Sequence, residues 1–459
     1  MREWLCERIC AELGQEYGTR LWHDMQDSIR LYHFYEGRTQ LWQVSPGLDY
    51  KPNRTVVNHT KRLIDKVAGF MFGRAPEITL TARDEEQAER VAQLEEHIRE
   101  VLDRNGWQKR LLNAGKDCFV GKRVALKVAA RDGGILLRFR PSIEFYHDVG
   151  VDDEEKLDRV IFAFGMNEQK DEASQRIWVQ SWKMENGACL LTEGVYNGFG
   201  AAIREDYKDA PTGLDGLPVY VILNEGTTGD IMGESDVKPL IGLQEAYNHL
   251  TSDDLDALRF NMFPQTVFTD ASEESMASVK ISPGASIDLQ TDPAAQDAKA
   301  NVTKLESHFN YNERFQSAQA TILKDMYKLM SCPQVTEEYL KAVGISGKAM
   351  RAMYWDLQCR CEERWAEWDT ALKWMVRQIV KQEKASGIAD WTDCDYSIRI
   401  EHLYPITEDE EQERALDMSE VAAQVRSRRS YMDKWQPNID ADEEIQRINE
   451  EKKLLEESY

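Results

Sequence analysis

The sequence lacks any long apolar run. Its first residues, MREWLCERICAEL, place charges among the apolar side chains and have no uninterrupted apolar segment of the kind found in a signal peptide. A helix that crosses a bilayer needs about 20 consecutive apolar residues, and the chain contains no such stretch. We therefore expect a soluble protein that does not span a membrane.

Basic residues are scarce relative to acidic ones. The 459 residues include 57 Lys and Arg against 81 Asp and Glu, which gives a formal net charge of −24. A protein that grips nucleic acid by neutralising phosphates needs the opposite balance. The composition favours either simple solubility or a protein that lets a polyanion pass without holding it. The length allows two or three domains and a substantial core.

Cysteines are few and are not spaced as metal ligands. The eight cysteines are scattered along the chain, which is typical of free thiols in a reducing cytoplasm. Cys6 and Cys10 lie at helical spacing, and Cys359 and Cys361 form a C-x-C, but neither pair has a second pair or a nearby His at zinc-finger spacing. We interpret them as small buried apolar residues and expect no metal and no cofactor.

Catalytic signatures are also missing. The sequence contains no G-x-S-x-G, H-E-x-x-H or C-x-x-C, and its eight histidines are dispersed. His147 and Asp148 could form a metal or acid–base pair, but a histidine at the end of a strand beside a polar turn is far more common. The sequence predicts no enzyme.

The stretch GISGK (344–348) resembles the end of a phosphate-binding loop. That motif requires G-x-x-x-x-G-K-[ST], whereas here the glycines are three apart and Ala349 follows the lysine, so no hydroxyl is placed for magnesium. We interpret the region as flexible, with hinges at Pro333, Gly344 and Gly347.

An acidic cluster, Asp253, Asp254 and Asp256, could suggest two-metal nuclease chemistry. On a helix, residues 253 and 256 share a face with His249 and Phe260, which offer little further ligation. We prefer to interpret the cluster as a solvated acidic face.

Patterns along the chain predict an α+β fold. From about 118 to 224, short apolar or alternating runs such as KRVALKVAA and LPVYVILN are separated by Gly, Asp and Asn, which indicates an antiparallel or mixed sheet. A helical pattern of more than thirty residues begins near residue 349. DYSIRIEHLYP alternates like a strand, and a capping box at Thr407 and Glu410 starts the last helices.

The middle of the chain predicts two long helices around a small β insert. GESDVKPLIGLQEAYNHLTSDDLDALRFN (233–261) reads as one helix, roughly 40 Å long at about 1.5 Å per residue. Residues 263–301 supply the strand candidates QTVFTD and SVKISPGASIDLQ, and residues 302–330 predict the second helix. One face of the first helix is marked by apolar residues, namely Leu240, Leu243, Tyr247, Leu250 and Leu258.

Three stretches, taken in order, resemble one known family. NRTVVNHTKRLIDKVAGFMFGRAPEIT (53–79) is similar to a helix running into a turn of the GYLFG-P type. LPVYVILNEGTTGDIMGESDVKPLIGLQEAYNHLTSD (217–253) is similar to a strand, an Asn-containing loop and a long helix, and SIRIEHLYPITEDEEQ (397–412) to a late strand before an acidic helix. Together they resemble the portal proteins of tailed double-stranded DNA bacteriophages, the connectors of head and tail. The resemblance covers roughly residues 30–450, and the order of its short motifs carries it.

The resemblance implies a portal fold in a ring, usually of twelve subunits, around an axial channel. The expected parts are the wing (1–234), the first stem helix (235–262), the clip (263–301), the second stem helix (302–330), the channel loop (331–348), the long wing helix (349–386), a return strand of the wing (387–406) and the crown helices (407–459).

Charged residues of the stem and loop are candidates to line that channel. A basic bore would bind duplex DNA tightly through counterion release, whereas an acidic bore with sparse basic rings could steady it without arresting it. The loop carries both signs, so its net charge in the bore stays open. The candidates are Asp253, Asp254, Asp256, Lys324, Lys328, Glu337, Glu338, Lys341 and Lys348.

The resemblance also implies partners and a location. The partners would be further copies of the chain, double-stranded DNA passing non-specifically, the large terminase ATPase and then the head-completion adaptor at the clip, and the major capsid and scaffolding proteins. The location would be the capsid vertex of the virion, after assembly in the host cytoplasm. Two other interpretations stay open: a metal-dependent DNA-processing enzyme or terminase component, and an α+β scaffold that binds proteins without forming a ring.

Overall fold

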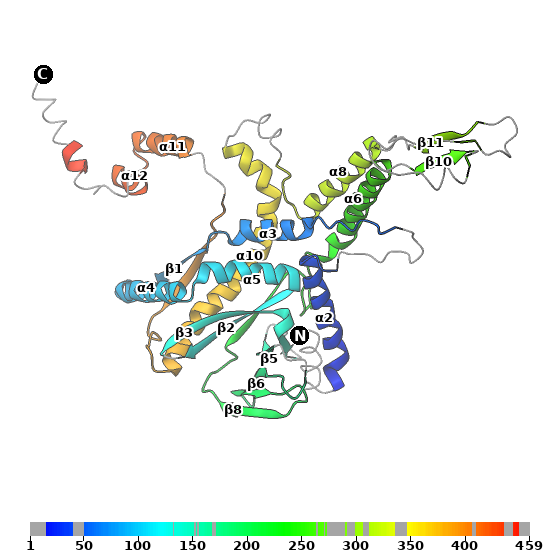
Figure 1. The fold of residues 1–459 in the computed structure, drawn as a ribbon. Helices are drawn as coiled ribbons and strands as arrows, with labels where there is room; N and C mark the ends of the chain where they lie inside the picture. Colours follow the sequence, from blue (N-terminus) through cyan, green and yellow to red (C-terminus); the bar gives the residue numbers. More distant parts are fainter. Residues whose placement is uncertain are drawn as a thin grey trace, which may run out of the picture.

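The computed structural model describes residues 15–39, 50–131, 133–150, 153, 156–167, 171–262, 265–269, 271–272, 290–291, 299–305, 312–335, 347–405, 410–435 and 444–448. Figure 1 shows a body of helices and sheets, an arm of two helices that ends in a β-ribbon, and two short helices that stand apart from the body. The fold is α+β, as predicted. In this part of the chain no helix combines the length and the apolarity needed to cross a bilayer.

The strands predicted within residues 118–224 form two antiparallel sheets, with the orders β3-β2-β9 and β4-β5-β6-β7-β8. Strand β2 is buried on both faces: Val124 and Leu126 lie in the main core, and Ala125 between them lies in a second core with Phe145. The strand bounds are β2 Arg123–Arg131, β3 Gly134–Pro141, β4 Phe145–Val149, β5 Leu157–Gly165, β6 Ile177–Glu185, β7 Ala188–Tyr196, β8 Ala202–Pro211 and β9 Val219–Leu223.

Helices cover the main core of the body (Figure 1). They are α2 Gln15–Tyr35, α3 His59–Phe72, α4 Ala88–Arg104, α5 Trp107–Gly121 and α10 Gly347–Ala385, and short 3-10 turns lie at η1 Glu85–Gln87 and η2 Ser142–Glu144. Helix α10 confirms the long helical pattern. Its Trp365 and Trp368 are almost fully buried, whereas Trp355 is 62% exposed.

A two-stranded ribbon ties the late part of the chain to the early part. Strand β12, Tyr396–Glu401, pairs antiparallel with β1, Glu77–Ala82, so that Ile400 faces Ile78 and Ile398 faces Leu80. This confirms the strand predicted from DYSIRIEHLYP. Because the two strands are more than 300 residues apart in the sequence, only tertiary structure shows that they pair.

The arm corrects two helix boundaries. The first helix is α6, Ile241–Met262, preceded by a 3-10 turn η3 at Lys238–Leu240, where Pro239 stands. The second is α8, Asn312–Leu329, and it does not begin at residue 302, because Asn301–Leu305 form strand β11 paired with β10, Gln265–Thr269. The β-branched residues of NVTKL pair with QTVFT, so sheet pairing overrides the helical pattern. Most of SVKISPGASIDLQ lies outside the described residues.

A glycine allows α3 and α5 to pack closely. A Cβ atom built on Gly115 of α5 would lie 2.3 Å from the Phe72 ring of α3. That ring cannot retreat, because its centroid lies 5.2 Å from that of Trp365 and 4.6 Å from that of Trp368. Side chains in such a core sit at close-packed density, so position 115 requires glycine.

We expect Gly115→Ala to destabilise the protein by about 1–3 kcal/mol, because the extra methyl overpacks the core. Gly69→Ala in α3 is the matched control, since a Cβ at Gly69 meets nothing within 4 Å. The control should be neutral or stabilising by about 0.5–1 kcal/mol, because alanine favours a helix. Urea unfolding of the two variants measures both effects, and equal stabilities would contradict the packing argument.

Candidate functional site

The arm is built from α6 and α8, which run side by side (Figure 1). The Gln319 side-chain amide of α8 donates to the Thr251 hydroxyl of α6 at 3.0 Å. The exposed residues of α8 include Ser317, Thr321, Lys324 and Lys328, which recur at helical spacing and therefore form one polar stripe.

Helix α6 is held to the body by polar side chains. Its buried residues are Gln244, Asn248, Ser252 and Asp256, which follow one another at intervals of four residues. The expected apolar face is therefore wrong for this helix: Leu243, Tyr247 and Leu250 are partly exposed, and Leu258 is 46% exposed.

These four side chains accept hydrogen bonds from the backbone of residues 53–60, which we call the strap. The Asn53 N–H donates to Asp256, the Thr55 N–H to Ser252 Oγ at 3.0 Å, and the Val57 N–H to Asn248 Oδ1 at 3.1 Å. At the inner end, the Thr60 N–H at the start of α3 donates to Gln244 Oε1 at 2.9 Å.

The strap and α6 stay in register because the distance between successive hydrogen-bonding positions is nearly the same in both segments. Two residues of an extended strap advance about 6.6 Å, and four residues of a helix advance about 6.0 Å. Alternate strap amides therefore meet successive turns of α6. Two aromatic contacts flank this ladder, Tyr50 with Phe260 at 4.9 Å and His59 with Tyr247 at 4.6 Å between ring centroids. Sequence reasoning missed the ladder, although the polar i, i+4 repeat within α6 is its signal.

The ladder corrects the interpretation of the acidic cluster. Asp253 is exposed and Asp254 is partly exposed, but Asp256 is only 6% exposed and its carboxylate also accepts from the Asn53 side chain at 2.6 Å. Asp256 is thus not part of a solvated face. Its carboxylate is engaged in holding the strap, because buried amides need an acceptor.

The other predicted residues are spread over the arm and its base. Lys324 and Lys328 are exposed on α8, and Lys328 Nζ lies 3.9 Å from Asp325. The Pro333 carbonyl oxygen accepts from Lys66 Nζ at 2.7 Å, and Gly347 begins α10. Outside the described residues or side chains lie Glu337, Glu338, Lys341, Gly344 and Lys348.

A charge network around the buried pair of Arg364 and Asp236 fixes the base of the arm to α10. Arg364 Nη2 donates to Asp236 Oδ1 and to Glu225 Oε1, both at 2.6 Å, and Arg360 Nη2 reaches the same two carboxylates. Burial alone would raise the pKa of Glu225, but Arg364 and then Arg360 outweigh it and hold that pKa below its usual value. The Asp236 N–H also donates to the Phe119 carbonyl of α5 at 2.9 Å.

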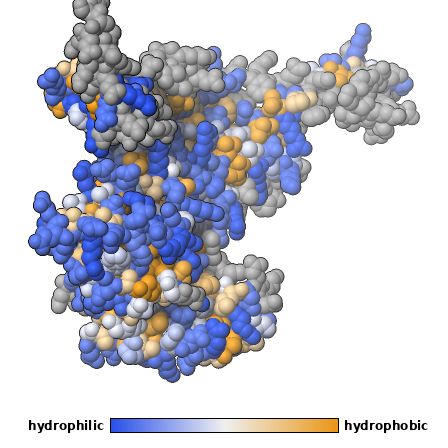
Figure 2. All heavy atoms as spheres, turned by 90° about the vertical axis from the view of Figure 1, so that its left-hand side faces the viewer, coloured by the Kyte–Doolittle hydropathy of each residue, from blue (hydrophilic) through white to orange (hydrophobic). Residues whose placement is uncertain are grey.

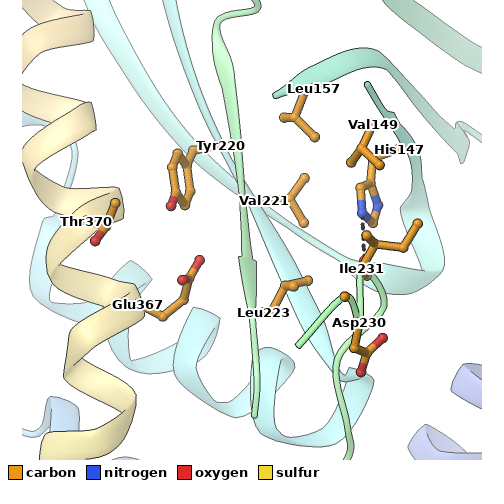
Figure 3. A pocket seen from close by; sticks show the side chains of 11 residues that line it. His147, Val149, Leu157, Tyr220, Val221, Leu223, Asp230, Ile231, Glu367 and Thr370 are labelled. Carbon is orange, nitrogen blue, oxygen red and sulfur yellow. Dashed lines mark hydrogen bonds between the residues drawn. The ribbon is translucent and has the colours of Figure 1, made fainter. Parts of the chain in front are cut away.

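A cavity of about 300 Å³ lies beside β9. Figure 3 shows Glu367 and Thr370 of α10 on one side of this strand and His147 of β4 on the other. His147 is 2% exposed, and its Nε2 donates to the Ile231 carbonyl oxygen at 2.9 Å. The histidine therefore fixes the loop that follows β9. The side chains do not converge as a nucleophile with an adjacent base would.

The interpretation of the C-x-C cysteines as buried apolar residues is confirmed for Cys361 and wrong for Cys359. Cys359 is exposed and Cys361 is buried, and both are free thiols. Within the described residues, no group of three or more His, Cys, Asp or Glu side chains could hold a metal ion. Cys6 and Cys10 lie outside those residues.

The sequence profile of one family, phage portal protein, SPP1 Gp6-like, matches residues 16–457. The chain belongs to this family. It is a portal protein, which confirms the family resemblance of the sequence. The match gives no support to a metal-dependent DNA-processing enzyme or a terminase component.

Two solved structures are similar to this portal protein. One is described as the neck of a native gene transfer agent particle computed with C12 symmetry, with 11% identity, a TM-score of 0.47 and coverage of 88% of this chain and 92% of that one. The other, the virion of a native gene transfer agent particle, has 12% identity, a TM-score of 0.42 and coverage of 87% and 89%. No curated protein matches the chain. The family assignment rests on the profile.

A histidine clamps the chain as it leaves the body of the portal protein towards residue 410. His402 Nδ1 lies 3.2 Å from Glu362 and Nε2 lies 3.0 Å from Asp369, both on α10, and the imidazole stacks on Trp365 at 4.3 Å. The Tyr404 hydroxyl also donates to Glu362 at 2.7 Å. Burial alone would lower the pKa of His402, but Asp369 and then Glu362 outweigh it and raise it above its usual value.

We expect Asp256→Ala to destabilise the portal protein by about 1–3 kcal/mol, because the strap amide of Asn53 loses its acceptor. Asp253→Ala is the matched control on the exposed side of the same helix and should change stability by no more than about 0.5 kcal/mol. Denaturant unfolding gives the stabilities, and amide exchange at residue 53 should quicken in the first variant alone. Equal effects would contradict the ladder.

We expect the His402 clamp to weaken as the pH rises. Because its folded pKa is raised, its contribution is fully present below the unfolded value of about 6.5 and is lost as the pH rises through the folded pKa. The free energy of unfolding of wild type should exceed that of His402→Gln by on the order of 1 kcal/mol at low pH, after allowing for solvent screening. The difference should be smaller at high pH. Thermal unfolding from pH 6 to pH 9 measures the difference; a constant gap would refute the clamp.

Proposed function

We propose that the chain forms a closed ring at the capsid vertex, with twelve copies as the number that the family resemblance implies. Double-stranded DNA would enter and leave the capsid through its bore. The single observation that carries this proposal is the portal profile, which spans residues 16–457. In a ring each copy presents two different patches to its neighbours.

The arm supplies two faces that suit this role. On α6, Leu255, Leu258 and Met262 recur at i, i+3 and i+7 and are 38%, 46% and 68% exposed. Figure 2 shows hydrophobic residues among hydrophilic ones along the arm. We assign these residues to contacts with a neighbouring copy, because exposed apolar stripes mark interaction surfaces.

The polar stripe of α8 is our candidate for the bore. It carries Lys324 and Lys328 and small hydroxyl side chains, Ser317 and Thr321. Each of the two lysine positions would become one basic ring in the assembly, although the chain as a whole has a net charge of −24. Sparse basic rings attract phosphates without the many contacts that bind DNA tightly. Asp253 and Asp254 stay candidates for the acidic part of the wall, and Asp256 does not.

The remaining predictions belong to the same proposal. The domain division given above places α6 and α8 in the stem, β10 and the start of β11 in the clip and residues 407–459 in the crown. The clip would receive the large terminase ATPase and later the head-completion adaptor, and the wing would meet capsid and scaffolding proteins. The protein would assemble in the host cytoplasm and would act as a conduit, with hydrolysis left to the ATPase.

The test combines assembly with DNA handling. Native mass spectrometry and negative-stain images of the purified protein should show rings, and a stable monomer would refute the proposal. The double variant Lys324→Glu with Lys328→Glu should still form rings but package or retain less DNA, because its bore repels phosphates. Glu313→Gln, at the outer end of α8, is the control. Normal DNA content in the double variant would remove α8 from the bore.

A further inference from the structure

Strand β9 is a sheet edge without the usual protection. It lies at the end of the order β3-β2-β9, so no described strand pairs with its outer side. Soluble proteins protect such edges with charges, prolines or bulges, because an open edge pairs readily with another extended chain. The edge strand β8, AIREDYKDAP, has charged residues along its length and register shifts against β7. Strand β9, VYVIL, has neither charges nor prolines and pairs with β2 in a regular register, so its outer side is open to pairing.

The outer side of β9 presents backbone hydrogen-bonding groups. In an antiparallel pair, successive residues of a strand alternate between bonding to the partner strand and facing away from it. The Asn224 N–H at the end of β9 donates to the Lys122 carbonyl at 2.7 Å, so the even-numbered residues of β9 bond to β2. The N–H and C=O groups that face outward belong to Val219, Val221 and Leu223. Among the described residues, none forms a hydrogen bond with these groups.

This open edge faces the cavity of about 300 Å³ beside β9, which Val221 and Leu223 help to line. At Leu223 the cavity meets a wider groove of about 960 Å³ between the loop after β9 and α10. The two hollows share Leu223, Asp230 and Glu367 and are therefore continuous. Volumes of roughly 300–1,000 Å³ are typical of ligand sites. An extended segment has room to lie along β9 with its backbone paired to the open edge.

The two walls of this groove differ in chemistry. Figure 3 shows Val149 and Leu157 on one side of β9, and Glu367 and Thr370 of α10 on the other side. Successive side chains of a strand point to opposite faces of its sheet. A segment paired with β9 would therefore place alternate side chains on the apolar wall and on the α10 wall.

The α10 wall is acidic. Glu363 is exposed and lies one helical turn before Glu367, and both line the groove. Arg364, between them in the sequence, is buried and is engaged by Asp236 and Glu225. Among the described residues, no base forms an ion pair with Glu363. Four residues of a helix advance about 6.0 Å and two residues of a strand about 6.6 Å, so basic side chains at alternate positions of a segment match the two acids.

We propose that the open edge of β9 is a docking site for an extended segment of a partner protein in which basic and apolar residues alternate. The segment adds a fourth strand to the sheet β3-β2-β9. Its basic side chains meet Glu363 and Glu367, and its apolar side chains meet Val149 and Leu157. Main-chain hydrogen bonds give such complexes their affinity, and the side chains give specificity. The described walls of the groove belong to one chain, so the inference does not depend on the ring proposed above.

Peptide binding to the full-length protein tests the proposal. The probe is a fluorescein-labelled peptide of sequence KVRVKVR, and fluorescence anisotropy measures its affinity. The control peptide VVVKRKR has the same composition but does not alternate. We expect saturable binding of the probe, and binding of the control that is weaker by about tenfold or more, because it loses apolar contacts and at least one hydrogen bond. Equal affinities would show charge attraction alone and would overturn the proposal, as would a probe that does not bind.

Methylated peptides test whether the segment binds as a strand. Only alternate amides of a strand face its neighbour, so N-methylation of one alternate set of amides in KVRVKVR should abolish binding and methylation of the other set should not. This measurement needs no protein variant. The same loss for both sets, or no loss for either, would refute strand addition.

A substitution within β9 tests the edge itself. Val221→Pro removes an outward N–H but no bond to β2, which an edge strand tolerates, and it should abolish probe binding. Val221→Ala is the matched control, since it also shortens the side chain but keeps the N–H, and it should retain most of the affinity. Full binding by Val221→Pro, or a complete loss in both variants, would contradict pairing through the backbone.

A charge-neutral pair tests the acidic wall. Glu363→Gln with Glu367→Gln should weaken probe binding by roughly three- to tenfold, as expected for the loss of two partly exposed ion pairs. Glu86→Gln with Glu89→Gln is the matched control, because it removes the same charge from exposed positions outside the groove and should leave the affinity unchanged. An equal loss in the two double variants would show a long-range charge effect and would remove the acidic wall from the site.

Discussion

The arm depends on hydrogen bonds between the strap and α6. A helix of a globular protein is usually held by a buried apolar stripe, but the buried residues of α6 are polar. Hydrogen bonds are directional and require fixed donor positions, so the ladder sets the angle between arm and body more strictly than apolar contact would. Its inner rung, Gln244 to the Thr60 N–H, also caps the start of α3. The ladder thus couples the arm directly to the main core.

The charge network of Asp236, Arg364 and Glu225 completes this joint. Buried ion pairs add little net stability, but breaking one leaves an uncompensated charge, so they select one geometry. Here the network joins α10, the loop after β9 and the start of the arm. Ladder and network hold the arm through polar contacts on one side, and the apolar residues of α6 stay on the surface. Those residues are then free to meet other copies.

The acidic composition and the exposed apolar surface have a common explanation in a ring around DNA. A net charge of −24 keeps separate copies soluble and opposes tight binding of a polyanion. Apolar residues at Leu258, Met262, Leu416 and Val425 would be a liability in a monomer. In the ring proposed above, a neighbouring copy would cover the exposed apolar residues of α6.

The sequence by itself determined the α+β class, the position of most elements and the portal family, because periodicity and short ordered motifs are local properties. Only tertiary structure decided what each polar residue does. Asp253 and Asp256 look equivalent in the sequence, yet one is exposed and the other holds the strap. Likewise, the sequence pattern predicts a helix that includes most of NVTKL, but in the structure this segment is a strand that pairs with QTVFT. The physical reason is that the local sequence pattern does not depend on a hydrogen-bond partner about 200 residues away. That partner nevertheless decides whether a polar side chain is exposed to water or buried against another segment.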